Sequence, residues 1–175
     1  DLFEGIGQVA EVQPAPEWLT DVEFERLGRY LESTALDPYD DRTEARRVRA
    51  LRDRTLAAVM LYAGLREMEA ANLVMTDINL SERKGKITVR MGKGEKYRTV
   101  PLVDAGLRKM LKRWLEVRGS EAEGDFVFPA DGGGRMSERT IQERVGAIGA
   151  RCGVDDLRAH RLRHTFCKRL ADAGV

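Results

Sequence analysis

The sequence predicts a mainly α domain that carries one small three-stranded antiparallel sheet. Apolar residues recur at helical spacing over most of the chain, and the spacing changes to strand-like alternation only between residues 78 and 102. The chain has 175 residues, 42% of them hydrophobic and 34% charged, which is enough for one compact domain with a buried core. The predicted class is therefore α+β with the helices dominant.

The first 17 residues are expected to form a linker or arm. They hold Gly5, Gly7, Pro14 and Pro16 and show no helical period. The domain itself is expected over residues 18–175.

The first helix is predicted to begin at a capping box formed by Thr20 and Glu23. The hydroxyl of one and the carboxylate of the other can satisfy free backbone amides at a helix start. Phe24, Leu27 and Leu31 follow at helical spacing, so they are expected to face the core.

A long helix is predicted from about Thr43 to Ala63, after a turn around Pro38, and a short helix from about Arg66 to Asn72. A glycine between the two helices is suited to end the first of them. The apolar stripe of the long helix is formed by Val48, Leu51, Leu56, Val59 and Met60.

The sheet is predicted from three short segments. Residues 78–80, 87–91 and 97–102 have strand-like sequences, and the last two alternate. Gly92 and Gly94 lie in the link between those two strands, so Lys93 between them is placed at the tip of a hairpin.

Helical spacing returns in the second half of the chain. It covers residues 107–115, a helix that Ser137 caps and Gly153 ends, and a last helix that starts near His160. The last helix is expected to pack Leu162, Phe166 and Leu170.

The net charge of +1 alone argues against a nucleic-acid partner, but it hides a split. Residues 1–80 hold 9 basic and 16 acidic residues, and residues 81–118 hold 12 basic and 4 acidic residues. Of the 30 basic residues 23 are arginines, the side chain suited to bidentate phosphate contacts. Most single arginines are nevertheless expected to be ordinary solvated surface residues.

The cysteine content and the chain start predict a cytoplasmic protein, kept in a reducing compartment. Cys152 and Cys167 are too few for a disulfide framework, and the first residues lack the basic and apolar blocks of a secretion signal. No apolar run is long enough for a membrane span, so no membrane association is expected.

Three short elements carry candidate chemistry. His160 and Arg163 are three residues apart on a helix, so they project from one face and can hold an anion between them. Arg66 follows a glycine turn at a helix start, where free amides favour an anion, and Glu69 one turn later can orient its guanidinium. Lys93 can swing toward a leaving oxygen. Each element alone also fits an ordinary surface pair or turn lysine.

Taken in order, these elements resemble the tyrosine recombinases, the phage-integrase family, and most closely its Xer-like branch. Residues 64–69 look like the first arginine box of the family, residues 92–102 look like its lysine hairpin, and residues 160–166 look like its second arginine box. The resemblance runs from about Thr20 to the last residue. It implies a bacterial or phage-encoded protein with the catalytic-domain fold of that family, preceded by a linker from a DNA-clamping domain.

The resemblance implies cleavage and rejoining of DNA strands through a 3′-phosphotyrosyl intermediate. Arg66 and Arg163 would bind the non-bridging phosphate oxygens and stabilise the transition state. Lys93 would protonate the departing 5′-oxygen, and His160 would assist proton transfer at the nucleophile. Because these cationic groups stand where other enzymes use magnesium, no metal and no cofactor are expected.

The nucleophilic tyrosine of the family is expected to lie beyond Gly174. The four tyrosines, Tyr30, Tyr39, Tyr62 and Tyr97, all precede the second arginine box. The chain is therefore interpreted as a catalytic domain shortened before its nucleophile, and it is expected to be inactive in covalent cleavage by itself.

The implied partner is double-stranded DNA, on which the full-length protein is expected to assemble as a tetramer. Lys96 and Arg98 beside the lysine hairpin are expected to follow the DNA backbone. Arg139, Thr140 and Arg144 match the region where the family places a helix against the major groove, although each is equally suited to a solvent-exposed helix surface.

Three other functions remain open from the sequence. The chain can be a DNA-binding relic or regulator that uses the same phosphate site without chemistry. It can be a type IB topoisomerase, which shares the chemistry, but those enzymes have a Lys-x-x-Arg box where this chain has a His-x-x-Arg box. It can also be a structural or scaffold protein. Neither the target sequence nor the choice among host resolvase, phage integrase and transposon recombinase follows from these residues.

Overall fold

The helices begin and end at the capping residues that the sequence shows. In a computed structural model of the protein, which describes residues 17–33, 43–81, 83–91, 96–119 and 124–174, helix α1 (Asp21–Glu32) begins at the capping box of Thr20 and Glu23. Helix α5 (Glu138–Cys152) begins at Ser137, whose hydroxyl accepts from the Thr140 amide, and it ends at a glycine with a positive φ of 67°. These boundaries confirm the predicted ones.

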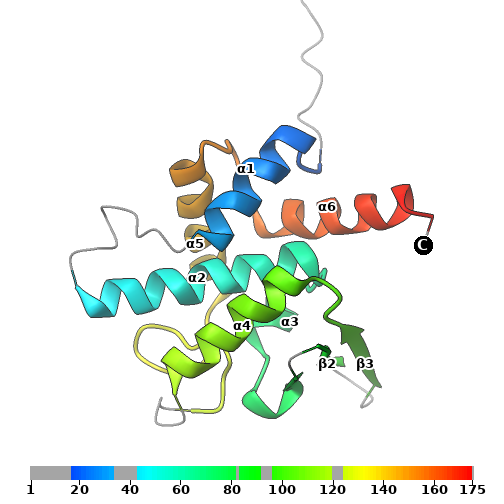
Figure 1. Ribbon diagram of the computed structural model, residues 1–175. Coiled ribbons are helices and arrows are strands. Elements are labelled where there is room, and N and C mark those ends of the chain that lie inside the picture. Colours follow the sequence, from blue (N-terminus) through cyan, green and yellow to red (C-terminus); the bar gives the residue numbers. More distant parts are fainter. Residues whose placement is uncertain (1–16, 34–42, 82, 92–95, 120–123, 175) are drawn as a thin grey trace, which may run out of the picture.

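The fold class is also confirmed. Over the described residues there are six α-helices and one small sheet; α2 (Glu44–Tyr62) runs through the middle of the molecule, and the sheet lies at one edge beside α3 (Figure 1). The remaining helices are α3 (Glu67–Ala71), α4 (Ala105–Arg118) and α6 (Ala159–Asp172). Helix α2 contacts all five other helices.

The sheet is an antiparallel meander in the order β1–β2–β3. A 3-10 turn at 75–77 leads into β1 (Ile78–Leu80), which pairs with β2 (Gly85–Met91), and β2 pairs with β3 (Lys96–Pro101). Ile87 and Val89 are buried against the helices, whereas Lys86, Arg90 and Tyr97 lie on the exposed face. The predicted hairpin is present, but its tip with Lys93 lies outside the described residues, as do residues 1–16 of the expected linker and the turn around Pro38.

Helix α2 is buried more completely than the predicted stripe implies. Every residue from Thr55 to Leu61 is buried, and Arg52 and Arg54 are buried with them, whereas Val48 and Leu51 are only half-buried. A helix that is enclosed by neighbours on several sides has no solvent face along its centre, so an amphipathic pattern underestimates its buried surface.

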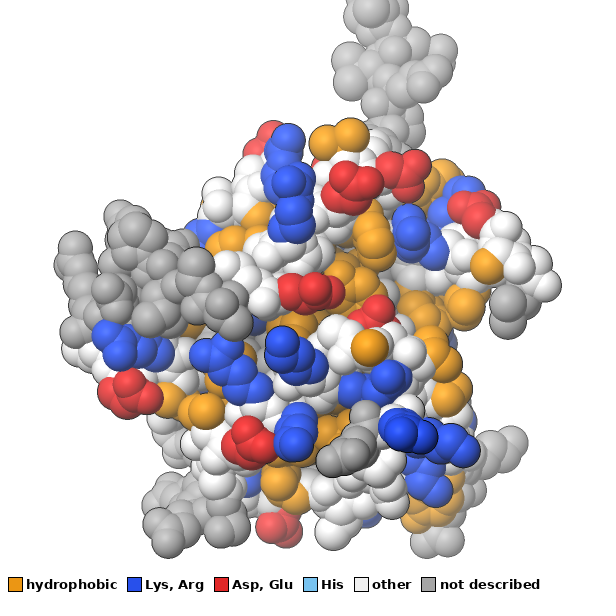
Figure 2. Space-filling view, viewed as in Figure 1, with side chains coloured by type: hydrophobic (Ala, Val, Ile, Leu, Met, Phe, Trp, Pro, Cys, Tyr) orange, Lys and Arg blue, Asp and Glu red, His pale blue; other side chains and the backbone are white. Residues whose placement is uncertain are grey.

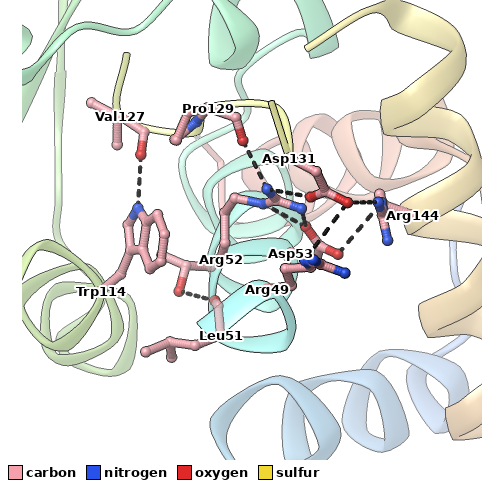
Figure 3. Close-up of polar contacts among 10 residues, drawn as sticks. Arg49, Leu51, Arg52, Asp53, Trp114, Val127, Pro129, Asp131 and Arg144 are labelled. Atoms are coloured by element: carbon pink, nitrogen blue, oxygen red, sulfur yellow. Dashed lines mark hydrogen bonds and ion pairs between the residues drawn. The ribbon is translucent and has the colours of Figure 1, made fainter. Parts of the chain in front are cut away.

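Arg52 of α2 and Trp114 of α4 join these two helices to the segment before α5 (Figure 3). The Arg52 guanidinium donates to the Pro129 carbonyl at 2.8 Å and pairs with Asp53 and Asp131 at 2.9 Å. Burial raises the pKa of Asp53 in spite of the arginine beside it. On α4, the Trp114 indole donates to the buried Val127 carbonyl at 2.8 Å.

The start of α1 is fastened to α6. The Leu19 amide donates to the Thr165 hydroxyl at 2.9 Å across 146 residues of sequence. The Arg161 guanidinium, which is buried, donates to both carboxylate oxygens of Glu23 at 2.9 Å. The capping carboxylate of α1 therefore also holds the helix that carries the second arginine box.

Helix α6 extends beyond the body of the molecule at its C-terminal half (Figure 1). Leu162 is fully buried and Phe166 is half-buried, but Leu170 is 37% exposed. The prediction that Leu170 packs is wrong, because the described residues contact this part of α6 through other side chains: Arg169 lies over the Phe24 ring and Lys168 over the Trp18 ring.

Candidate functional site

The first arginine box forms a turn and a short helix start. Gly64 has a positive φ of 64°, Leu65 is buried, and Arg66 stands at the N-cap of α3 with a side chain that is 56% exposed. Glu69 accepts hydrogen bonds from the Arg66 amide at 2.8 Å and from its guanidinium at 3.0 Å. The contact expected between Glu69 and Arg66 is thus present, and it leaves most of the guanidinium facing solvent.

Glu69 also binds Arg98 of β3, a contact that the sequence reasoning missed. Nη1 and Nη2 of Arg98 each donate a hydrogen bond to one carboxylate oxygen of Glu69, at 2.6 and 2.7 Å. Although burial raises its pKa, the hydrogen bonds from Arg98 and from the Arg66 amide outweigh that effect and lower the pKa of Glu69 to about 2. The carboxylate is therefore ionised and fully occupied at neutral pH.

The second arginine box lies against the first. A guanidinium nitrogen of Arg163 donates to the Gly64 carbonyl, two residues before Arg66. One turn further along α6, the Phe166 ring packs so closely on Gly64 that a Cβ there would come within 2.2 Å of it. Residues almost a hundred positions apart in the chain are thereby brought into one site.

Both histidines lie on the first turns of α6. His160 is exposed, and its ring meets that of His164 edge to face with 5.7 Å between centroids. The Nδ1 atom of His164 lies 3.3 Å from a Glu17 carboxylate oxygen. His160 borders an open hollow between α5 and residues 154–158, so it is accessible from outside.

Gln142 of α5 ties the two arginine boxes together, and sequence reasoning missed it as well. Its side chain donates to Glu67 on α3 and accepts from the Ala159 amide, at 3.3 Å, at the start of α6. A single glutamine within an amphipathic helix carries no pattern that marks this role.

The residues expected to contact DNA on α5 are engaged within the protein. Arg139 pairs with Glu143 at 2.9 Å but is 88% exposed. The Thr140 hydroxyl meets that of Ser137 at 2.8 Å, and Arg144 pairs with Asp131 at 2.9 Å (Figure 3). Their contacts with DNA stay predictions, as does that of Lys96, whose side chain lies outside the described residues.

The groups that the two arginine boxes carry are suited to an anion. Arg163 donates to the Gly64 carbonyl, two residues before Arg66, and His160 lies one turn before Arg163 on the same helix. On the face shown in Figure 2, lysine and arginine side chains are interspersed with acidic and apolar ones. Among the described residues, no group of three or more His, Cys, Asp or Glu is arranged to hold a metal ion.

The mainly helical fold, the small sheet and the contact between the two arginine boxes are the features of one protein family. The chain belongs to the phage integrase family, whose family model matches residues 18–175. The chain is 30% identical over 156 residues to the tyrosine recombinase XerC of Actinobacillus succinogenes, a match that covers 88% of this chain and 48% of that protein. The chain thus spans about half the length of the relatives it matches.

Solved structures agree with this assignment. The XerH site-specific recombinase bound to its difH substrate matches with a TM-score of 0.72 and 25% identity over 90% of this chain and 43% of that one. The XerA recombinase matches with a TM-score of 0.73 and 27% identity over 93% of this chain and 53% of that one. The resemblance and the fold class that the sequence predicts are confirmed. Among the described residues, no helix has the length and apolar character needed to cross a membrane.

Proposed function

We propose that this chain supplies the phosphate-binding part of a site-specific recombinase that cleaves and rejoins DNA strands through a 3′-phosphotyrosyl intermediate. The observation that carries the proposal is the contact of Arg163 with the Gly64 carbonyl, next to Arg66. This contact brings the helix that carries Arg163 against the turn that precedes Arg66. In the proposal, the two permanently charged guanidinium groups bind the non-bridging oxygens of one phosphodiester.

In this proposal Arg66 and Arg163 stabilise the charge that develops on the phosphate in the transition state. His160 assists proton transfer at the nucleophile, and Lys93 protonates the departing 5′-oxygen. The guanidinium groups remain charged throughout, so the residues themselves supply the electrostatic stabilisation. Glu69 acts through Arg66 and does not touch the phosphate.

The nucleophile in this proposal is a tyrosine other than Tyr30, Tyr39, Tyr62 and Tyr97, so the chain by itself does not form the covalent intermediate. The environment of Tyr62 supports this for one of them. Burial, together with the charges of Glu32 and Asp104, raises the pKa of Tyr62 to about 12. A phenol so reluctant to ionise is a poor nucleophile at neutral pH.

Duplex DNA is the proposed partner. Support comes from the XerH relative, whose structure is of a recombinase bound to its DNA substrate. Assembly of the full-length protein as a tetramer on DNA is part of the same proposal.

The competing function is a DNA-binding module that uses the same phosphate-binding groups without chemistry. Strand joining separates the two functions, because that half-reaction needs no tyrosine. A nicked duplex is prepared with a p-nitrophenyl ester on its 3′-phosphate beside a 5′-hydroxyl. The 5′-oxygen attacks phosphorus, the bond to the nitrophenyl oxygen breaks, and p-nitrophenolate leaves. The hydroxyl proton passes to Lys93, the reverse of the proton transfer proposed for cleavage.

A pool of such duplexes with randomised flanks is incubated with the chain. We expect joined strands and free p-nitrophenolate, and a loss of about 10²–10³-fold in rate for Arg163→Ala. Arg169→Ala, which removes a guanidinium from the same helix, serves as the control and should keep the rate. Binding of the pool without any joining would favour the non-catalytic module.

A further inference from the structure

We propose that Arg98 is a positioning residue, which holds the β2–β3 hairpin against α3 through Glu69 and does not touch DNA. This inference rests on the proposed function, since the hairpin and α3 carry groups assigned there to the reacting phosphate. It replaces the sequence expectation that Arg98 follows the DNA backbone.

The alternation of β3 directs Arg98 inward. Tyr97 and Thr99 are exposed, whereas Arg98 and Val100 between them are half-buried. In the sheet register Arg98 stands opposite Val89 of β2, which is 1% exposed. The guanidinium therefore leaves the strand on the core side of the sheet.

The pairing of Arg98 with Glu69 uses both oxygens of the carboxylate. Two nearly parallel hydrogen bonds of 2.6 and 2.7 Å are the geometry of a planar fork on a carboxylate. The Glu69 side chain is only 12% exposed and that of Arg98 is 31% exposed. A phosphate that captured Arg98 would leave a largely buried carboxylate short of donors, which is a costly state.

The same carboxylate takes two hydrogen bonds from Arg66. Arg98, Glu69 and Arg66 therefore form one continuous set of contacts from β3 to the N-cap of α3. Because Arg98 follows Lys93 closely in the sequence, fixing β3 at this point fixes the base of the hairpin relative to Arg66. Small errors in such a separation are expensive in catalysis, where a displacement of about 1 Å can cost about 100-fold in rate.

A positioning role and a DNA contact differ in two measurable ways. A phosphate contact contributes about 1 to the slope of log affinity against log salt concentration, and its loss lowers that slope. A lysine can still serve a phosphate as a point charge, whereas it cannot replace a planar fork on a carboxylate. Arg98→Lys and Arg98→Met are therefore the informative pair, with Arg66→Ala as the variant that removes a phosphate contact.

The experiment measures binding of the randomised duplex pool at several salt concentrations and the rate of joining from the p-nitrophenyl ester. We expect both Arg98 variants to keep the salt slope of the unchanged chain and to lose about 100-fold in joining rate at saturating DNA. Arg66→Ala should lower the slope by about 1. Lys112→Ala, an exposed residue of α4, should change neither quantity.

A coupling measurement shows which group Arg98 acts through. If it positions the hairpin, Arg98→Lys should cause no further loss of joining in a chain that already carries Lys93→Ala. A general structural defect caused by Arg98→Lys would lower the joining rate both with and without Lys93→Ala. Thermal unfolding of each variant identifies such a defect.

A lower salt slope for Arg98→Met, with recovery in Arg98→Lys, would overturn the inference and restore the DNA contact. Full additivity with Lys93→Ala would also count against it. If the unchanged chain joins no strands, the proposed function fails instead, and the salt slopes alone then decide whether Arg98 serves the carboxylate or DNA.

Discussion

Replacement of Gly64 by alanine should destabilise the protein, because this glycine stands at the contact between the two arginine boxes. Its φ of 64° is a left-handed conformation that costs an alanine about 1–2 kcal/mol. The added Cβ would also lie 2.2 and 2.4 Å from two carbons of the Phe166 ring. Overpacking of this kind typically costs about 1–3 kcal/mol. The free energy of unfolding should therefore fall by about 2–5 kcal/mol.

Chemical and thermal unfolding, followed by circular dichroism, measure this loss. For a chain of this size the expected change corresponds to a fall of roughly 4–20 °C in Tm. The matched control is Gly146→Ala on α5, where nothing lies within 4 Å of the added Cβ. That change should leave stability unchanged or raise it by up to about 1 kcal/mol.

The double variant Gly64→Ala with Phe166→Leu tests the cause. A smaller side chain opposite the new methyl group should recover the overpacking part of the loss but not the backbone part. A Gly64→Ala variant as stable as the unchanged chain would refute the reasoning, since neither the strain nor the clash would then be real.

Three further predictions concern buried polar contacts. The pKa of Glu69 in the folded chain is about 2, below its ordinary 4.5, so the ionised carboxylate stabilises the fold fully above about pH 4.5 and loses this effect as the pH falls toward 2. The difference in the free energy of unfolding between the unchanged chain and Glu69→Gln, measured in urea, should narrow over that range. Trp114→Phe should cost about 1–3 kcal/mol in chemical unfolding, because the buried Val127 carbonyl loses its donor. Arg52→Ala should cost about 3–5 kcal/mol in the same assay, because it leaves the buried Asp53 carboxylate without its closest cation.

Each of these has an outcome that would contradict it. A gap for Glu69→Gln that stays constant down to pH 2 would mean that the carboxylate is not paired in solution. Unchanged stability of Trp114→Phe would mean that water or another donor serves Val127. Arg46→Ala, an exposed position in the first turn of α2, is the control for Arg52→Ala and should lie within about 0.5 kcal/mol of the unchanged chain.

Most of the fold was predictable because its signals are local. Thr20 with Glu23, and Ser137 with Gly153, mark helix ends through hydrogen bonds made within a few residues. The sheet follows from alternation over adjacent segments, so its order needed no long-range information. The arginine at position 52 was not placed inside, because one of its carboxylate partners, Asp131, lies far away in the sequence.

The candidate site was predictable in its residues but not in all its contacts. The spacing of Arg66 and Glu69 within one helical turn predicted their hydrogen bond. The inward direction of Arg98 was also readable, since it alternates with Tyr97, but its partner Glu69 was not, because nothing in the local pattern of a strand identifies the helix residue it will meet.

The fastening of Leu19 to Thr165 and of Glu23 to Arg161 has a consequence for synthesis. Translation delivers α1 early and α6 late, so α1 leaves the ribosome well before the helix that satisfies its capping carboxylate exists. Contacts between such distant parts of a chain form slowly and late. The helix that presents His160 and Arg163 is therefore secured only after nearly all of the described residues have emerged, and the two arginine boxes of a nascent chain do not meet before then.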